Sequence, residues 1–156
     1  MSTTERRFWE LYEKSLSRRY AKHPTIKGIP LPEKATLQPN DVSIVIATID
    51  TPKVFTECLA SFLTNNPLEI VIVTIPKDEG HVMRLVNAVD DPEGKITVLT
   101  VDKANKRGQM VRGIQQVSGK VIALVDDDTT WPQTTVLPYL LAGFEDKRVG
   151  GASGSQ

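Results

Sequence analysis

The sequence lacks the features that would place it in several large classes of protein. Its 156 residues include one cysteine, Cys58, which excludes an internal disulfide framework and favours a reducing compartment. No run approaches the roughly 20 apolar residues of a membrane-spanning helix, and the polar residues after Met1 do not resemble a signal peptide. Lysine plus arginine equals aspartate plus glutamate at 19 each, so no overall charge favours nucleic acid. The composition is that of a soluble globular protein.

Glycine-rich phosphate motifs are also missing. Neither G-x-G-x-x-G nor G-x-x-x-x-G-K-[ST] occurs, which excludes a dinucleotide fingerprint and a P-loop. We expect Gly150, Gly151 and Gly154 to lie in a loose tail or an interrupted loop. Cys58 falls in an apolar helical pattern and is expected to be a buried structural thiol. His23 and His81 have no partners at metal-ligand spacing, so both are expected on the surface.

Three regions follow one another along the chain. Residues 1–23 predict an amphipathic helix, with apolar residues on one face and basic residues on the other. A helix packed on its own domain is favoured over one lying on a membrane surface or a partner. Residues 24–40 contain four prolines and predict an extended linker. Residues 41–156 predict an α/β domain.

Strand and helix patterns alternate regularly in that domain. Strand patterns occupy residues 42–48, 69–75, 95–101 and 120–125, and helical patterns occupy residues 52–63, 79–89, 104–117 and 132–144. Strands that alternate with helices of about a dozen residues predict right-handed βαβ units and a parallel sheet.

The most informative stretch is Val121–Val125 followed by Asp126, Asp127 and Asp128. Five consecutive apolar residues predict a strand buried on both faces, as in the centre of a parallel sheet. Three adjacent acids repel one another, so folding alone gives little reason to place them where such a strand ends. Mg²⁺ or Mn²⁺ would remove that cost and bridge to a diphosphate. The alternative is that Asp128 or Thr129 only caps a helix that begins near Pro132.

Two further stretches are expected at the same edge of the sheet. The turn Thr48–Thr51 follows the first strand, and either contacts a ligand or caps the next helix. Lys103, Lys106 and Arg107 gather at the start of a helix, where the macrodipole favours acids instead. Such a cluster suits a bound anion, with Gly108 allowing close approach of the backbone; a solvated basic patch is the alternative.

The order VSIVIATID, KANKRGQMVRGIQQVSGK, VIALVDDDTTWP and VGG resembles family 2 glycosyltransferases. It looks closest to the membrane-bound synthases of hyaluronan, chitin and cellulose, in a form associated with fungi, and covers Asp41 to about Gly151. The resemblance implies a GT-A-like, Rossmann-like fold with a mostly parallel sheet flanked by helices, incomplete at its C-terminus. It also implies sugar transfer from a nucleotide-sugar, expected to be a UDP-sugar, to a growing polysaccharide, on the cytoplasmic side of a membrane.

The resemblance also assigns residues. Ala47, Thr48 and Asp50 would contact the nucleoside, and Lys106, Arg107, Asp126 and Asp127 the rest of the donor. Asp126 and Asp128 form the family's D-x-D motif and would hold Mg²⁺ or Mn²⁺. The family's acid pair after the second strand is replaced by Val73–Pro76, and Asp78 is the candidate substitute.

The family's catalytic-base motif, its Q-x-x-R-W motif and its membrane helices do not occur in this sequence. We therefore expect the donor-binding half of an enzyme, from a fragment or a shortened product, with no candidate general base. Two alternatives stay open. Asp126-x-Asp128-x-Thr130 also fits the nucleophile motif of haloacid-dehalogenase-like phosphatases, with Asp126 attacking phosphorus, although only Lys147 follows as a lysine. The other alternative is a truncated, non-catalytic domain that binds nucleotide weakly or serves in interactions.

Overall fold

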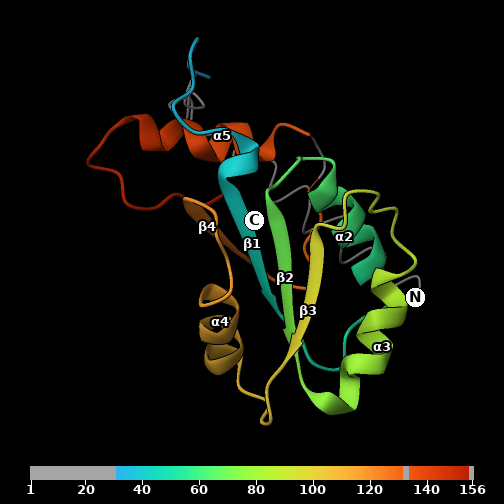
Figure 1. Ribbon diagram of the computed structural model, residues 1–156. Helices are drawn as coiled ribbons and strands as arrows, with labels where there is room; N and C mark the ends of the chain where they lie inside the picture. Colours follow the sequence, from blue (N-terminus) through green and yellow to red (C-terminus); the bar gives the residue numbers. More distant parts are fainter. Residues whose placement is uncertain (1–30, 132–133, 155–156) are drawn as a thin grey trace, which may run out of the picture. The chain divides into compact units, whose positions relative to one another are not determined.

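A computed structural model describes residues 31–131 and 134–154 (Figure 1), and residues from Leu31 onward form a compact unit of their own. The expected N-terminal helix, with His23, and the first part of the expected linker lie outside the described residues. The end of that linker contacts the domain, because Thr36 donates from N and Oγ1 to the Glu145 carboxylate at 2.7 and 2.6 Å. None of the described helices is long and apolar enough to cross a membrane.

The described domain is built on a four-stranded parallel sheet with the order β3-β2-β1-β4. Its strands are β1 (Val42–Ala47), β2 (Glu69–Thr74), β3 (Ile96–Thr100) and β4 (Val121–Val125). The predicted parallel sheet is therefore confirmed, and each strand end lies within one residue of its predicted position.

Helices cover both faces of the sheet, as Figure 1 shows for α2 and α3 on one side and α4 on the other. The helices are α2 (Phe55–Leu63), α3 (Pro76–Val86), α4 (Lys106–Ile114) and α5 (Val136–Ala142), with short 3-10 turns η1 (Pro39–Asp41) and η2 (Gly143–Glu145). Buried side chains of β1, β2, α2 and α3 form the main core. A smaller cluster joins Val42 to Leu137 and Leu141 of α5.

Helix boundaries differ more from the prediction than strand boundaries do. Helix α3 begins at Pro76 rather than at residue 79, because proline suits the first helical turn and Asp78 and Glu79 follow it there. Helix α4 begins after Asn105, whose Oδ1 accepts a hydrogen bond from Gly108 N at 3.1 Å. A proline in the first turn of α3 and a capping hydrogen bond at α4 therefore set these boundaries, and hydrophobic periodicity reports neither.

The prediction that β4 is buried on both faces is wrong. Ile122 and Leu124 are 39% and 53% exposed, whereas β1 and β2 are the strands buried on both faces. Ile122 and Leu124 are register partners of Ser43 and Val45, so they lie on the face that α4 covers over β1 and β2. Within the described residues, β4 ends the sheet and no helix covers this face of it. The strand's apolar run reflects one covered face and one open face.

Candidate functional site

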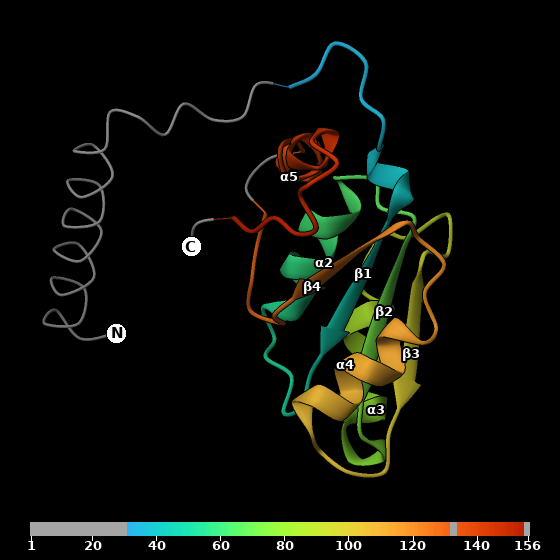
Figure 2. The ribbon, with the colours of Figure 1, turned by 90° about the vertical axis from the view of Figure 1, so that its left-hand side faces the viewer.

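The predicted site residues meet at the carboxyl edge of the sheet. Strands β1 and β4 are hydrogen-bonded neighbours, so Thr48 after β1 and Asp126 after β4 emerge side by side. Figure 2 shows the arrowheads of these two strands next to each other. Helix α4 starts at the same edge, because the segment after β3 leads directly into Lys106. Parallel strands that end together place these side chains where ligands of open α/β sheets bind.

Thr48 joins the first turn to the acids. Its side chain is buried, and its Oγ1 donates a short hydrogen bond to Asp127 Oδ2. The Thr48 and Thr51 hydroxyl oxygens are 2.8 Å apart, and since Thr48 gives its proton to Asp127, Thr51 must donate to Thr48. The middle acid of the triplet is therefore tied to the turn after β1.

Lys106 joins the basic helix to the acids. Its Nζ lies 2.6 Å from Asp126 Oδ1, and both side chains are largely exposed. The hydrogen bond to Asp126 and the nearby negative charges raise the pKa of Lys106. The side chain of Asp128 has no hydrogen bond or ion pair to any other described residue, and the same holds for the exposed side chain of Arg107. Groups suited to metal and diphosphate thus lie together with bonding capacity to spare.

The turn after Thr48 has an unusual backbone. Asp50 has φ of +47°, a left-handed conformation that aspartate and asparagine adopt more readily than most residues other than glycine. Its N–H donates to Asp78 Oδ2 at 2.9 Å, and its carboxylate lies 3.7 Å from Lys77 Nζ. Asp78 is the residue expected to replace the family's acid pair, and one of its oxygens is already committed to the turn.

Two further residues extend the site toward α2 and α3. His81 was expected on the surface, but it is half-buried, with Nε2 3.0 Å from the Thr51 carbonyl oxygen. The imidazole therefore braces the turn, a role that its sequence neighbours do not reveal. Cys58 is buried, as predicted, and burial together with the negative charges of Asp128 and Asp127 raises the pKa of its thiol. A raised pKa disfavours the reactive thiolate.

Gln109 was missed at the sequence level. It is 2% exposed, and its Nε2 donates to the carbonyl oxygens of Thr48 and Val73 at 3.0 and 2.8 Å. The sequence offers one signal: Gln109 and Gly113 are four residues apart and therefore lie on the same side of the predicted helix. In the structure this side faces inward, while the apolar Val111 and Ile114 are 53% and 39% exposed. A polar residue and a glycine on the inner side of a helix indicate a close, hydrogen-bonded contact with the sheet.

Asp126 and Asp128 can supply part of the coordination of a divalent cation, but not all of it. No group of three or more His, Cys, Asp or Glu side chains among residues 31–131 and 134–154 is arranged to hold a metal. Asp126 and Asp128 nevertheless supply the hard oxygen ligands that Mg²⁺ and Mn²⁺ prefer. Mg²⁺ in nucleotide sites is commonly held by one or two carboxylates plus the substrate phosphates. The residues therefore fit a metal whose coordination a bound diphosphate completes.

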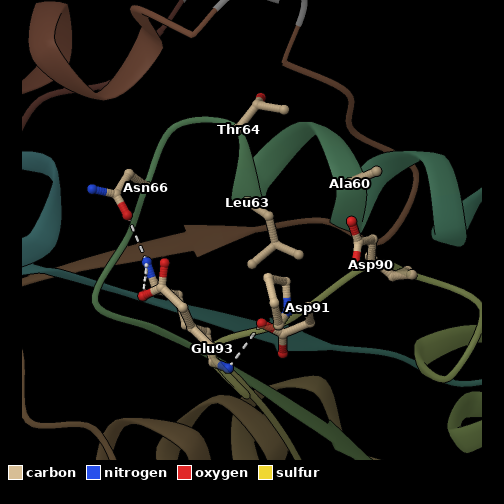
Figure 3. A pocket seen from close by; sticks show the side chains of 10 residues that line it. Ala60, Leu63, Thr64, Asn66, Asp90, Asp91 and Glu93 are labelled. Carbon is tan, nitrogen blue, oxygen red and sulfur yellow. Dashed lines mark hydrogen bonds and ion pairs between the residues drawn. The ribbon is translucent and has the colours of Figure 1, made fainter.

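A hollow of about 390 Å³ lies at the opposite edge of the sheet (Figure 3). It is lined by the end of α2 and by the segments that lead into β2 and β3. Lys95 Nζ donates to Asn66 Oδ1 at 2.6 Å. Asp91 accepts hydrogen bonds from the N–H groups of Lys95 and Ile96, both at 3.0 Å. The polar groups here are used to shape the backbone, and none of the predicted site residues reaches this hollow.

Comparison with known proteins identifies related sequences. A sequence model described as "Glycosyltransferase like family 2" matches residues 39–156. An NDP-glycosyltransferase, ltbB, of Aspergillus luteorubrus is 42% identical over 149 residues, which are 95% of this chain and 36% of that protein. A type 2 glycosyltransferase of Zymoseptoria tritici is 39% identical over 133 residues, 85% of this chain and 28% of the relative. The chain thus spans about a third of these relatives' length.

Solved structures support the same fold. The mannosyltransferase PcManGT from Pyrobaculum calidifontis, in complex with GDP-Man and Mn²⁺, matches with a TM-score of 0.63 at 18% identity, over 78% of this chain and 37% of that one. Staphylococcus aureus TarS 1–349 matches with a TM-score of 0.52 at 18% identity, over 74% and 38%. The parallel sheet flanked by helices is therefore the α/β arrangement of GT-A glycosyltransferases.

Proposed function

The chain belongs to the family 2 glycosyltransferases, and from that premise we propose that it holds a nucleoside diphosphate-sugar at the carboxyl edge of its sheet. The observation that carries this proposal is the meeting of three separate segments at one edge. Thr48 contacts Asp127, and Lys106 contacts Asp126, so the turn after β1, the start of α4 and the acids after β4 form one cluster. A donor with a nucleoside, a diphosphate and a metal needs these three kinds of group.

Each segment has a distinct role in this proposal. Ala47, Thr48 and Asp50 contact the nucleoside. Lys106 and Arg107, at the start of α4, bind the diphosphate together with the helix N-terminus. Asp126 and Asp128 hold Mg²⁺ or Mn²⁺, which when bound neutralises the leaving diphosphate. Asp127 fixes the acids to the first turn through Thr48.

We also propose the chemical class of the sugar donor and of the acceptor. We propose a UDP-sugar as donor and a growing polysaccharide as acceptor, on the strength of the sequence resemblance to polysaccharide synthases. The structural relative with bound GDP-Man makes a guanine nucleotide the alternative to test. Transfer also needs a general base near the acceptor hydroxyl, and we assign no residue of this chain to that role. Location at the cytoplasmic side of a membrane stays a proposal as well.

A thermal-shift titration tests the donor site directly. UDP, a UDP-sugar, GDP and GDP-mannose are each added with Mn²⁺ and again with EDTA. A ligand that binds only the folded state raises the melting temperature, so we expect a rise of several degrees that needs both nucleotide and metal. The Asp126→Asn/Asp128→Asn variant should lose that rise.

The matched control is Asp90→Asn/Glu93→Gln, which removes two exposed acids beside the opposite hollow. It should keep the metal-dependent rise. No rise in the cooperatively melting wild type would refute the donor site. Binding without sugar transfer would favour the non-catalytic alternative, and phosphate release through a phosphoenzyme on Asp126 would favour the phosphatase.

A further inference from the structure

The buried residues of helix α4 that face the sheet are Gln109 and Gly113, a polar residue and a glycine. Gln109 donates from Nε2 to the Thr48 and Val73 carbonyl oxygens. Gly113, one turn later, approaches the sheet so closely that a Cβ added there would lie 2.4 Å from Val45 Cγ1. A buried amide with fixed partners specifies position more narrowly than apolar packing does, because a hydrogen bond weakens steeply when its geometry changes.

The two acceptors of Gln109 belong to the ends of neighbouring strands. Val73 O also accepts the Thr48 N–H at 3.0 Å, so one carbonyl oxygen holds both the turn after β1 and the side chain from α4. Thr48 in turn reaches Asp127 through its hydroxyl group. Gln109 is therefore the direct hydrogen-bonded link between α4 and the turn that orients the acids.

We propose that Gln109 is a positioning residue for donor binding, an inference that rests on the proposed function. Residues three apart on a helix lie on neighbouring positions of its surface, so the anchor at Gln109 sets where the first turn of α4 presents Lys106. The Lys106 ammonium then lies within hydrogen-bond reach of Asp126, at 2.6 Å, and beside the place proposed for the diphosphate. Gln109 touches no donor atom in this scheme; it acts through Lys106.

A purely structural role makes a different prediction. If Gln109 only stabilises the fold, then its replacement lowers the melting temperature and leaves the contribution of Lys106 to binding unchanged. If it positions Lys106, its replacement removes that contribution. A double-mutant cycle separates the two, because residues that act as a unit are not additive.

The cycle compares the wild type, Lys106→Ala, Gln109→Met and the double variant. UDP affinity with Mn²⁺ is measured by calorimetry below each protein's melting temperature. Lys106→Ala should weaken binding about tenfold, as expected for loss of a charge-assisted hydrogen bond. In the Gln109→Met background the same change should weaken it less than about threefold. Gln116→Met, which alters an exposed glutamine just after α4, should leave the tenfold effect intact.

If Gln109→Met does not fold, a second variant tests the same proposal. Gln109→Asn keeps the amide but shortens the side chain by one methylene, which leaves room for a bridging water that satisfies the buried polar groups. The direct hydrogen bonds to the two carbonyl oxygens are lost, so the effect of Lys106→Ala on affinity should be smaller in this background too. A full tenfold effect of Lys106→Ala in either folded Gln109 variant would overturn the proposal. Absence of metal-dependent UDP or GDP binding by the wild type would instead refute the donor site itself, before any Gln109 variant is made.

Discussion

The two edges of the sheet use their polar side chains in different ways. Where the strands begin, Glu69 accepts hydrogen bonds from Ser43 Oγ, Ser118 N and Ser118 Oγ at 2.7 to 2.8 Å, and Ser43 Oγ accepts one from Gly119 N. Where the strands end, Asp126 bonds to an exposed lysine and Asp128 to no other described residue. At the first edge the polar side chains are hydrogen-bonded to other protein groups, whereas at the second edge carboxylate oxygens stay available for a ligand.

The hydrogen bonds at the first edge also change the pKa of Glu69. Burial disfavours the charge on Glu69, but the hydrogen bonds from Ser118 and Ser43 outweigh it and lower the pKa of this carboxyl. Its charge is thus stabilised by the fold. The charge of Asp126 is met by Lys106, a side chain that a diphosphate would attract away. Polar groups that serve folding are paired with other groups of the protein, whereas groups that serve a ligand are left incompletely paired.

The largest effect should come from Gly119→Ala, at the amino edge. A Cβ there would lie 2.7 Å from Ser43 N and 2.8 Å from Asp41 O, both backbone atoms that cannot move cheaply. We expect a loss of about 3 kcal/mol in the free energy of unfolding, measured by urea denaturation. Gly150→Ala, where a Cβ meets nothing within 4 Å, should change it by less than about 0.5 kcal/mol. Equal stability of the two variants would contradict the close packing at Gly119.

Exchanging one acid at each edge should separate binding from stability. Asp128→Asn should weaken metal-dependent UDP or GDP binding at least about tenfold and leave the melting temperature unchanged or raised, since it relieves repulsion among the acids. Asp91→Asn should cost about 1 to 2 kcal/mol of stability, because both Asp91 oxygens accept backbone N–H groups. It should not affect nucleotide affinity measured by calorimetry. The reverse pattern would show that the two edges have been assigned the wrong roles.

Glu69 should make stability depend on acid pH. Its pKa in the folded chain is below the ordinary value of 4.5, so the folded state binds fewer protons than the unfolded state near that pH. The stabilisation is complete above about pH 4.5 and is lost as the pH falls through the lowered value. Urea denaturation between pH 7 and pH 3 should show a shallower loss for Glu69→Gln than for the wild type. Glu57→Gln, on the exposed side of α2, is the matched control.

The smallest effect on stability is expected for the exposed lysines that pair with acids at each edge. Lys106 and Asp126 are 2.6 Å apart, and Lys120 and Asp41 are 2.7 Å apart, with both lysine side chains more than half exposed. Exposed pairs contribute little, so Lys106→Met and Lys120→Met should each shift the melting temperature only slightly. Lys106→Met alone should weaken nucleotide binding. A matching loss in Lys120→Met would indicate a general effect of charge rather than a site.

Much of this fold can be predicted from the sequence, because its strands are short apolar runs between helical patterns. Strand bounds and the parallel arrangement follow from that pattern, and so does the meeting of Thr48, Lys106 and Asp126 at one edge. The burial of β4 does not follow, because an apolar strand reads the same whether or not a helix covers its second face. The contacts of His81 and Gln109 could not be predicted, because their partners are backbone carbonyls of other segments.

The sequence by itself therefore determined the α/β class, the order of strands and helices along the chain, the family, and which residues stand at the ends of strands. It did so because these depend on local periodicity and on which residues follow one another. Only the tertiary structure decided that Asp127 bonds to Thr48, that Asp78 holds the Asp50 turn and that Gln109 anchors α4. Each of these joins segments at least 28 residues apart, and such pairings arise from how the helices pack on the sheet rather than from any local pattern.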